Sequence, residues 1–291
     1  MPDKVRNSTG SADPAETLIA ILDSQEEPGR NVAERGVPSV LNDILARGQR
    51  ITDAPVVKPE IKKAIVAFVD MLGTSALMED IKEENAEKVY GTITGIAELF
   101  QDKFNDFSRI YADSKCMIIS DSFVISVPYE PEAFNALVLF LADFQHRCLV
   151  SYAEAMRGAV SVGNLLVGRD NKIIGPAFIR AHKIEKENAI FPRIVVDKRI
   201  VEDKELCPQT LGLPIALDKD GVRYVDFMAA GDADMSSVKE QTARRRLEFE
   251  KDDRKLKILQ KWDWLQTFLE QKSNACVDCC KVRSVVTGVT P

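Results

Sequence analysis

The chain has 291 residues, of which 45% are hydrophobic and 29% charged, and its formal net charge is -6. This length and apolar content are sufficient for one large or two smaller folded domains, each with its own core. The acidic balance argues against a protein that coats nucleic acid, because phosphates attract a basic surface. A small polyanionic substrate is still compatible with it, since a single basic pocket can lie in an acidic surface.

The N-terminal residues 1–10 are polar and of mixed charge, and they lack the apolar segment of a signal peptide. No uninterrupted apolar run approaches the length that spans a bilayer. We therefore expect a cytoplasmic protein with no membrane partner. Residues 1–57 contain two short amphipathic segments, 17–22 and 40–45, between Pro and Gly breaks. They predict an N-terminal extension of small helices.

The six cysteines are compatible with a reducing compartment. Cys116, Cys148 and Cys207 lie in or beside apolar runs and are predicted to be small buried side chains. The other three lie near the C-terminus and are Cys276, Cys279 and Cys280. They include one Cys-x-x-Cys pair but no second pair and no nearby His, so a zinc site with four ligands is not expected.

Residues 58–230 have regular periodicity and are expected to form one α+β domain. The elements expected in chain order are a strand at 64–69, a helix at 84–107, strands at 116–119 and 123–127, a helix from Pro131 and a strand at 158–167. This order, βαββαβ, is that of a ferredoxin-like core. A highly charged helix at 236–272 is predicted to follow, within a C-terminal segment 231–291.

Two carboxylates are expected to meet at one edge of this sheet. Asp70 ends the first strand, and Asp121 lies in the turn 120–122 that starts the third. Because the first and third strands of this topology are antiparallel neighbours, the end of the one lies beside the start of the other. A pair of carboxylates held at strand ends is typical of a two-metal site for Mg²⁺ or Mn²⁺.

The motifs around these acids resemble those of the class III nucleotide cyclase catalytic domain. The family's first strand ends in Phe-x-Asp-x-x-Gly, which residues 68–73 (FVDMLG) match, and its central hairpin carries the second metal Asp, which Asp121 matches. Its glycine-led strand and the helix after it are similar to residues 157–163 (RGAVSVG) and 175–185 (GPAFIRAHKIE). The resemblance covers about residues 60–230 and implies phosphoryl transfer assisted by two metal ions.

The resemblance also implies roles for the matched residues. Asp70, Asp121 and the carbonyl oxygen of Met71 would hold two divalent ions, Mn²⁺ or Mg²⁺, with Phe68 beside them. The backbone amides expected to cradle phosphate oxygens are those of Met71, Leu72 and Gly73. The cations expected at the phosphates are Lys183, Arg180 and Arg157.

Two positions that select the purine base in the family differ here. Met117 stands four residues before the second metal Asp, and Lys172 stands three residues before the Gly that leads the helix. A thioether makes no strong directional hydrogen bond, and a Lys only donates. Recognition of adenine or guanine in the usual manner is therefore not expected. The family's transition-state Asn and Arg fall on Ile179 and Lys183.

A chain that retains the metal acids but has an altered base pocket resembles the bacterial pyrimidine cyclases of the Pycsar antiphage systems. Those enzymes make cyclic UMP or cyclic CMP, which a separate effector binds. Lys115 and Lys172 favour UTP over CTP as the substrate, because O4 of uracil accepts a hydrogen bond where N4 of cytosine donates one. Tyr111 and Ser114 are also near enough in sequence to supply a contact to the base.

The family resemblance implies a head-to-tail homodimer with two shared sites. An apolar stripe in the C-terminal helix needs a partner, and because it spans only about two heptads it is expected to pack on its own domain. The stripe consists of Ile258, Trp262, Leu265 and Leu269.

Two other interpretations stay open. A catalytically silent cyclase-like module that binds a nucleotide or dimerises is favoured by Ile179 and Lys183. A polymerase-palm relative such as a diguanylate cyclase shares the core, but its Gly-Gly-Asp/Glu-Glu-Phe signature is missing from residues 120–123 (SDSF).

Overall fold

The structure is a computed structural model of the whole chain, and it describes residues 60–74, 78, 81–167, 172–206, 212–229, 235–250 and 255–287, with side chains as far as 273. The chain divides into two compact units, 1–56 and 57–291, and the described residues all belong to the second. The small helices expected at 17–22 and 40–45 lie outside the described residues. So do Cys207 and the side chains of the cysteine cluster at 276–280.

The first six elements of the described residues confirm the expected βαββαβ order. They are β1 (Glu60–Met71), α4 (Glu83–Ile110), β2 (Lys115–Ile119), β3 (Ser122–Pro128), α5 (Pro131–Tyr152) and β4 (Met156–Val167). β1 is antiparallel to β3 on one side and to β4 on the other. It begins four residues earlier than the apolar pattern indicated, because its first residues pair with the end of β4 although their side chains are exposed.

The remaining elements extend this sheet and cover its ends. They are α6 (Pro176–Asn188), β5 (Ile194–Val196), α7 (Lys198–Val201), β6 (Ile215–Leu217), β7 (Arg223–Val225), α8 (Met235–Glu250) and α9 (Leu256–Thr287). Among the described residues, the strand order is β2-β3-β1-β4-β5-β7-β6. β5 runs parallel to β4, so the sheet is mixed and the fold is α+β, as the sequence predicted.

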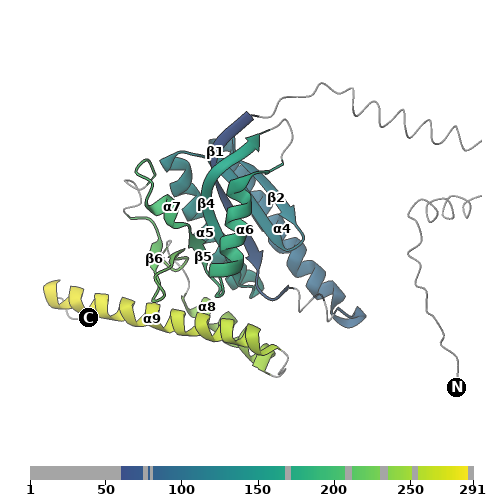
Figure 1. The fold of residues 1–291 in the computed structure, drawn as a ribbon. Coiled ribbons are helices and arrows are strands. Elements are labelled where there is room, and N and C mark those ends of the chain that lie inside the picture. Colours follow the sequence, from purple (N-terminus) through teal and green to yellow (C-terminus); the bar gives the residue numbers. More distant parts are fainter. Residues whose placement is uncertain are drawn as a thin grey trace, which may run out of the picture. The chain divides into compact units, whose positions relative to one another are not determined.

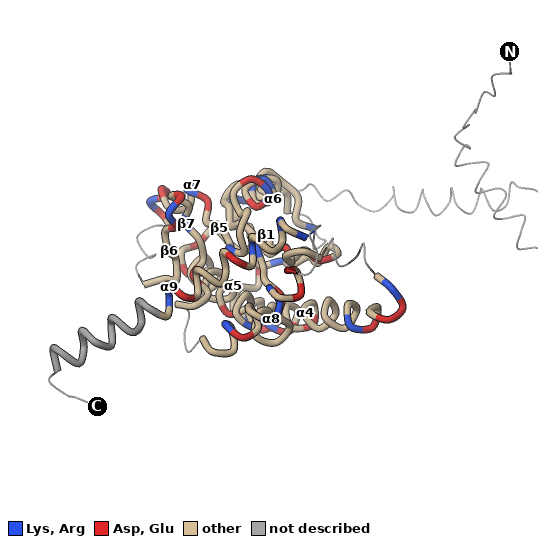
Figure 2. Tube along the Cα trace, turned by 90° about the horizontal axis from the view of Figure 1, so that it is seen from below, with Lys and Arg blue, Asp and Glu red and all other residues tan. Residues whose placement is uncertain are grey.

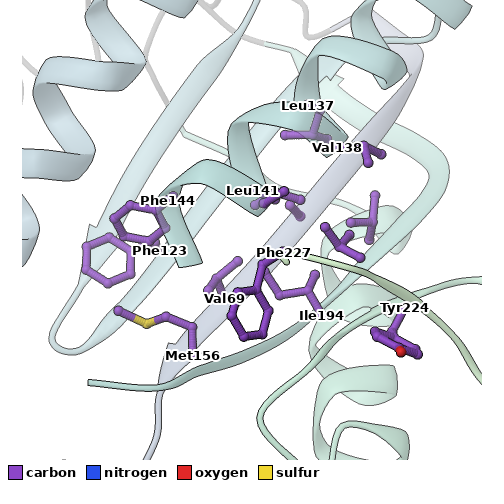
Figure 3. Packing of buried hydrophobic residues seen from close by; sticks show 14 of the residues in the cluster. Val69, Phe123, Leu137, Val138, Leu141, Phe144, Met156, Ile194, Tyr224 and Phe227 are labelled. Carbon is purple, nitrogen blue, oxygen red and sulfur yellow. The ribbon is translucent and has the colours of Figure 1, made fainter. Parts of the chain in front are cut away.

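Alternation along β1 divides the core into two layers. Ile65, Ala67 and Val69 belong to the large cluster that α4 and α5 cover, whereas Val66 and Phe68 belong to a smaller cluster beneath α6. Figure 3 shows side chains of α5 directed at Val69, Phe123 and Met156 of the sheet, and Figure 1 shows α6 crossing the opposite face. Asp70 lies two residues after Phe68 in the same strand, so its side chain is on the same face of the sheet, the face that α6 covers.

Helix α5 is the one described helix that is long and apolar enough, by composition, to cross a membrane. Its most apolar window is 56% buried inside the fold, and its buried residues include Phe134, Leu141 and Phe144. The apolar character of α5 therefore follows from its place in the core of this unit.

The C-terminal charged segment forms two helices, not the single helix expected from the sequence. α8 and α9 pack against each other, and residues 251–254 between them are not described. Trp262, Leu265 and Leu269 are buried in the large cluster, with exposures of 1% or less. The Trp262 ring also stacks on Phe249 of α8 with centroids 6.3 Å apart. The apolar stripe thus packs on its own domain.

A buried ion pair joins α8 to the end of α5. The Arg245 Nη2 donates to Glu154 Oε1 at 2.5 Å, and both side chains are more than nine-tenths buried. Burial raises the pKa of Glu154 to about 7, although the Arg245 charge lowers it. The pair lies close to the β1 end, since the carbonyl of the next residue, Ala155, accepts from the Leu72 amide at 2.9 Å.

We expect Trp262→Ala to lower the free energy of unfolding by about 3–5 kcal/mol, because it removes the largest fully buried side chain of the described residues and leaves a cavity. Urea denaturation followed by circular dichroism measures this loss. Leu256→Ala on the same helix removes a side chain that is 57% exposed, and it should change stability by less than about 0.5 kcal/mol. Equal effects of the two changes would contradict the packing described.

Glu154 predicts a specific dependence of stability on pH. Its pKa of about 7 in the folded chain exceeds the ordinary 4.5, so between these values the folded chain binds the proton more tightly than the unfolded chain does. The contribution of Glu154 to stability should therefore fall as pH rises through this window and stay constant above it. The unfolding free energy of the wild type minus that of Glu154→Gln should therefore decrease over the same pH range. Glu60→Gln, whose side chain is 71% exposed, is the control for the loss of a carboxylate at the surface.

Candidate functional site

The register of the sheet places the two predicted metal acids side by side. Asp70 is the penultimate residue of β1 and pairs with Ser122 of β3. Asp121 lies in the turn before β3, after Ser120, which has a left-handed φ of 56°. The Met71 amide donates to the Asp121 carbonyl at 3.2 Å, and so ties the end of β1 to this turn. Two acids 51 positions apart in the sequence thus meet at one edge of the sheet.

Asp70 is held by side chains from both neighbouring strands. Ser122 Oγ donates to its Oδ1 at 3.0 Å, and Arg157 of β4 donates to its Oδ2 through Nη2 at 3.0 Å and Nε at 3.3 Å. Burial raises the pKa of Asp70, and the charge of Asp121 adds to this, while Arg157 and Ser122 act in the opposite direction. The net increase means that burial outweighs the effect of Arg157 and Ser122 on this carboxyl group.

Arg157 also binds a third carboxylate, which the sequence analysis did not assign to the site. Its Nη2 lies 3.0 Å from Oε1 of Glu185 on α6, whose side chain is only 4% exposed. Burial raises the pKa of Glu185, and the charge of Asp70 contributes to the increase. Glu185 follows Ala177 and Ala181 at four-residue steps on the buried face of α6. An acidic residue in line with the buried alanines of this helix was the signal in the sequence that could have assigned Glu185 to the site.

The C-terminal helix brings a second cation to this cluster. Burial and the charge of Arg157 lower the pKa of Lys261, whereas the charges of Glu185 and Asp70 raise it. These interactions place Lys261 of α9 near the carboxylates. The sequence predicted only a packing role for this helix, and nothing in the spacing of its residues pointed to the site.

The donor set fits a divalent ion. Carboxylate and carbonyl oxygens are the ligands that Mg²⁺ and Mn²⁺ prefer, and Asp70, Asp121 and the Met71 carbonyl supply them. The Met71 carbonyl accepts from Thr74 Oγ1 at 3.1 Å and keeps a second lone pair. Within the described part of the chain, no group of three or more His, Cys, Asp or Glu side chains is arranged to hold a metal. Water and substrate phosphates would therefore have to complete the coordination.

The expected amide cradle differs from the structure. The Met71 amide donates to the Asp121 carbonyl, and the Leu72 amide donates to the Ala155 carbonyl, so these two are engaged by backbone acceptors. The side chains of both residues are buried in the large cluster. Gly73 is the one residue of the three with a left-handed φ, +85°. A phosphate contact by the amides of Met71 and Leu72 would have to displace these backbone hydrogen bonds or share their donors.

Phe68 lies two residues before Asp70 on the same face, but its ring is 7% exposed. It packs edge-on against the His182 ring at 5.0 Å and against Phe178 at 6.1 Å. Phe68 therefore supports α6 beside the acids rather than presenting an open surface to a ligand.

The predicted base-contacting lysines lie together in a separate pocket. Lys115 and Lys172 line a pocket of about 530 Å³, together with Lys62 and Lys63 from the start of β1. Ser114 also lines it, and its buried Oγ has no hydrogen-bond partner among the described residues. Met117 packs at the edge of the smaller core cluster, in the strand that carries Lys115. This pocket opens on the sheet at the end opposite to Asp70.

Lys183 and Arg180 lie apart from the acids of their own chain. Both line another pocket, of about 720 Å³, whose other cations are Lys198, Arg199 and Arg223. Lys183 is 68% exposed and lies 3.9 Å from Glu187, and Ile179 is 66% exposed. Figure 2 shows basic and acidic residues interspersed around α6 and α7. The structure thus brings Asp70, Asp121 and Arg157 together, and it does not bring Lys183 and Arg180 to them.

Comparison with known proteins gives similarity of fold. No family description and no curated protein sequence matches the chain. A solved bacterial light-regulated adenylyl cyclase is similar with TM-score 0.44 and 12% identity, over 74% of this chain and 71% of that one. The adenylyl cyclase CyaB from P. aeruginosa is similar with TM-score 0.43 and 17% identity, over 58% of this chain and 95% of that one. The guanylyl cyclase domain of the RhoGC fusion protein from the aquatic fungus Blastocladiella emersonii is similar with TM-score 0.44 and 11% identity. The match covers 58% of this chain and 96% of that one. At these identities the likeness concerns the fold alone.

We expect Asp70→Asn and Asp121→Asn each to weaken Mn²⁺ binding about tenfold or more, because each removes a negative oxygen ligand from the pair. Isothermal titration calorimetry of the purified chain with Mn²⁺ measures this. Asp106→Asn on α4 is the control, since its side chain is 77% exposed and pairs with the exposed Arg109. Wild-type affinity in either site variant would contradict a shared metal site.

Proposed function

We propose that the chain is a pyrimidine nucleotide cyclase that converts UTP to 3′,5′-cyclic UMP and diphosphate. The observation that supports this best is the pair Asp70 and Asp121, joined through the Met71 amide at one sheet edge. A carboxylate pair that repels itself is of little use to a protein unless cations bind it. The motif resemblance of residues 60–230 to class III cyclases supplies the reaction type.

In the proposed reaction, the ribose 3′-oxygen attacks the α-phosphorus of the same nucleotide. A P–O bond forms there, the bond to the β-phosphate oxygen breaks, the hydroxyl proton leaves and diphosphate departs. Two bound divalent ions would lower the pKa of the 3′-hydroxyl and neutralise phosphate charge. The protein residues position the reactants: Asp70 and Asp121 hold the ions, and Arg157 stands 3.0 Å from Asp70, near enough to turn toward a phosphate.

A head-to-tail homodimer completes the proposed site. Lys183 and Arg180 line a groove of their own chain that is separate from Asp70. They reach a triphosphate held by Asp70 and Asp121 only if those acids belong to another copy. The separation of the cations from the acids within one chain supports this arrangement, and it implies that a monomer is inactive.

The base is proposed to contact Met117 and the lysine pocket of the copy that supplies Lys183 and Arg180, because within one chain this pocket lies at the end of the sheet opposite to Asp70. Lys115 and Lys172 donate hydrogen bonds that suit the carbonyl oxygens of uracil, and the pocket of about 530 Å³ is large enough for a pyrimidine ring. CTP is the alternative substrate. A role as the signal-generating enzyme of a cytoplasmic antiphage system, with a separate effector that binds cyclic UMP, rests on the Pycsar resemblance.

A second candidate is a catalytically silent nucleotide-binding module. The observation in its favour is that Ile179, at the family's Asn position, is an exposed apolar side chain that can make no hydrogen bond to a ribose. Such a module would bind a nucleoside triphosphate without releasing diphosphate.

Incubation of the purified chain with each of the four ribonucleoside triphosphates and Mn²⁺, with products identified by mass spectrometry, tests the proposal. We expect cyclic UMP as the main product and a loss of at least about a thousandfold in rate for Asp70→Asn and Asp121→Asn, because both ions depend on the acid pair. Asp106→Asn should keep the wild-type rate. Cyclic AMP as the main product would refute the inference from Met117, and no product from any triphosphate would favour the silent module.

A further inference from the structure

The first turns of α9 lie against the turn that follows Asp70. A Cβ built on Gly73 would be 3.6 Å from Cδ1 and Cγ2 of Ile258. Ile258 is itself packed against the large core cluster. The C-terminal helix, which lies outside the region of cyclase resemblance, therefore contacts the same turn that carries the metal-side residues.

Lys261 follows Ile258 by three residues, a spacing that places two side chains on the same side of a helix. Its charge interacts with that of Arg157 and with those of Asp70 and Glu185, the two acids that the Arg157 guanidinium joins. Lys261 is thus a second cation in the neighbourhood of the carboxylate cluster, and it comes from a different element than Arg157.

The backbone of Lys261 is anchored. The neighbouring Trp262 is 0% exposed, and Leu265, one turn later, is 1% exposed in the core. Core packing therefore fixes this part of the helix, and the four-carbon stem of the lysine is its flexible part. A lysine on a rigid helix at the mouth of a site is suited to meet a phosphate as a point charge.

The balance of charge indicates what Lys261 would face in the loaded site. Three carboxylates, Asp70, Asp121 and Glu185, meet the two cations Arg157 and Lys261. Two divalent ions bound to the aspartates would compete with both cations for Asp70 and leave the cluster with excess positive charge. A polyphosphate offsets that excess and gives the released cations an anionic partner.

We propose that Lys261 binds the polyphosphate of the substrate, as a cation that the C-terminal helix supplies to the metal side of the site. This inference rests on the proposed function for the identity of the substrate. It adds to the site a residue that no part of the motif resemblance contains. In the absence of a nucleotide, Lys261 serves as a counter-ion of the carboxylate cluster.

The test is the binding of inorganic tripolyphosphate in the presence of Mn²⁺, measured by calorimetry on the full chain. Lys261→Met keeps the length of the side chain and removes its charge, and it should weaken tripolyphosphate binding about tenfold, the typical effect of one charged hydrogen bond. Lys261→Arg should restore affinity to within about threefold. Lys219→Met, in the exposed β6–β7 turn, removes the same charge elsewhere and should leave binding unchanged.

A purely structural counter-ion role predicts a different pattern. In that case Lys261→Met would lower the melting temperature and leave tripolyphosphate affinity within twofold of the Lys219→Met control, which would overturn the proposal. Absence of tripolyphosphate binding by the wild type would overturn it as well. Failure of the proposed function is distinguishable, since the wild type would then bind tripolyphosphate in a Lys261-dependent manner but form no cyclic nucleotide from any of the four triphosphates.

Discussion

The guanidinium of Arg157 is the interaction on which the candidate site depends. It lies between Asp70 of β1 and Glu185 of α6, at 3.0 Å from each, and so joins a strand of the sheet to the helix that covers it. Without this cation, two partly buried carboxylates would face each other beside Asp121, and their repulsion would push the strand and the helix apart. The planar fork of the arginine donates two hydrogen bonds to Asp70, and its charge forms an ion pair with Glu185 at the same time.

The rigidity of the site comes from the central position of β1. This strand pairs with β3 and β4 over most of its length (Figure 1), and its alternating side chains anchor both core layers. Asp70 follows directly on that anchored run, so its carboxylate is held in place by packing several residues away. The same backbone bonding explains why the amides of Met71 and Leu72 are engaged. A strand end that is fixed firmly enough to orient metal ligands has few free donors left for a phosphate.

The C-terminal helices join this architecture as part of the same folded unit. Trp262 and Leu265 complete the large core, and Ile258 reaches the turn at Gly73. Core packing and charge placement are thus coupled along one helix, since the residues that bury α9 also bring Lys261 to the carboxylates. The buried Glu154–Arg245 pair fixes α8 behind the same strand end.

The sequence by itself determined the order of the elements and the location of the acid pair. Apolar runs of strand and helix period are local signals, and the βαββαβ order makes the first and third strands neighbours, so Asp70 and Asp121 could be brought together without coordinates. Only the tertiary structure decided which groups surround them. Helix packing brings Glu185 and Lys261 near the acids, and it sets α8 and α9 against each other. These features rest on contacts between residues distant in the chain, and periodicity carries no information about such contacts.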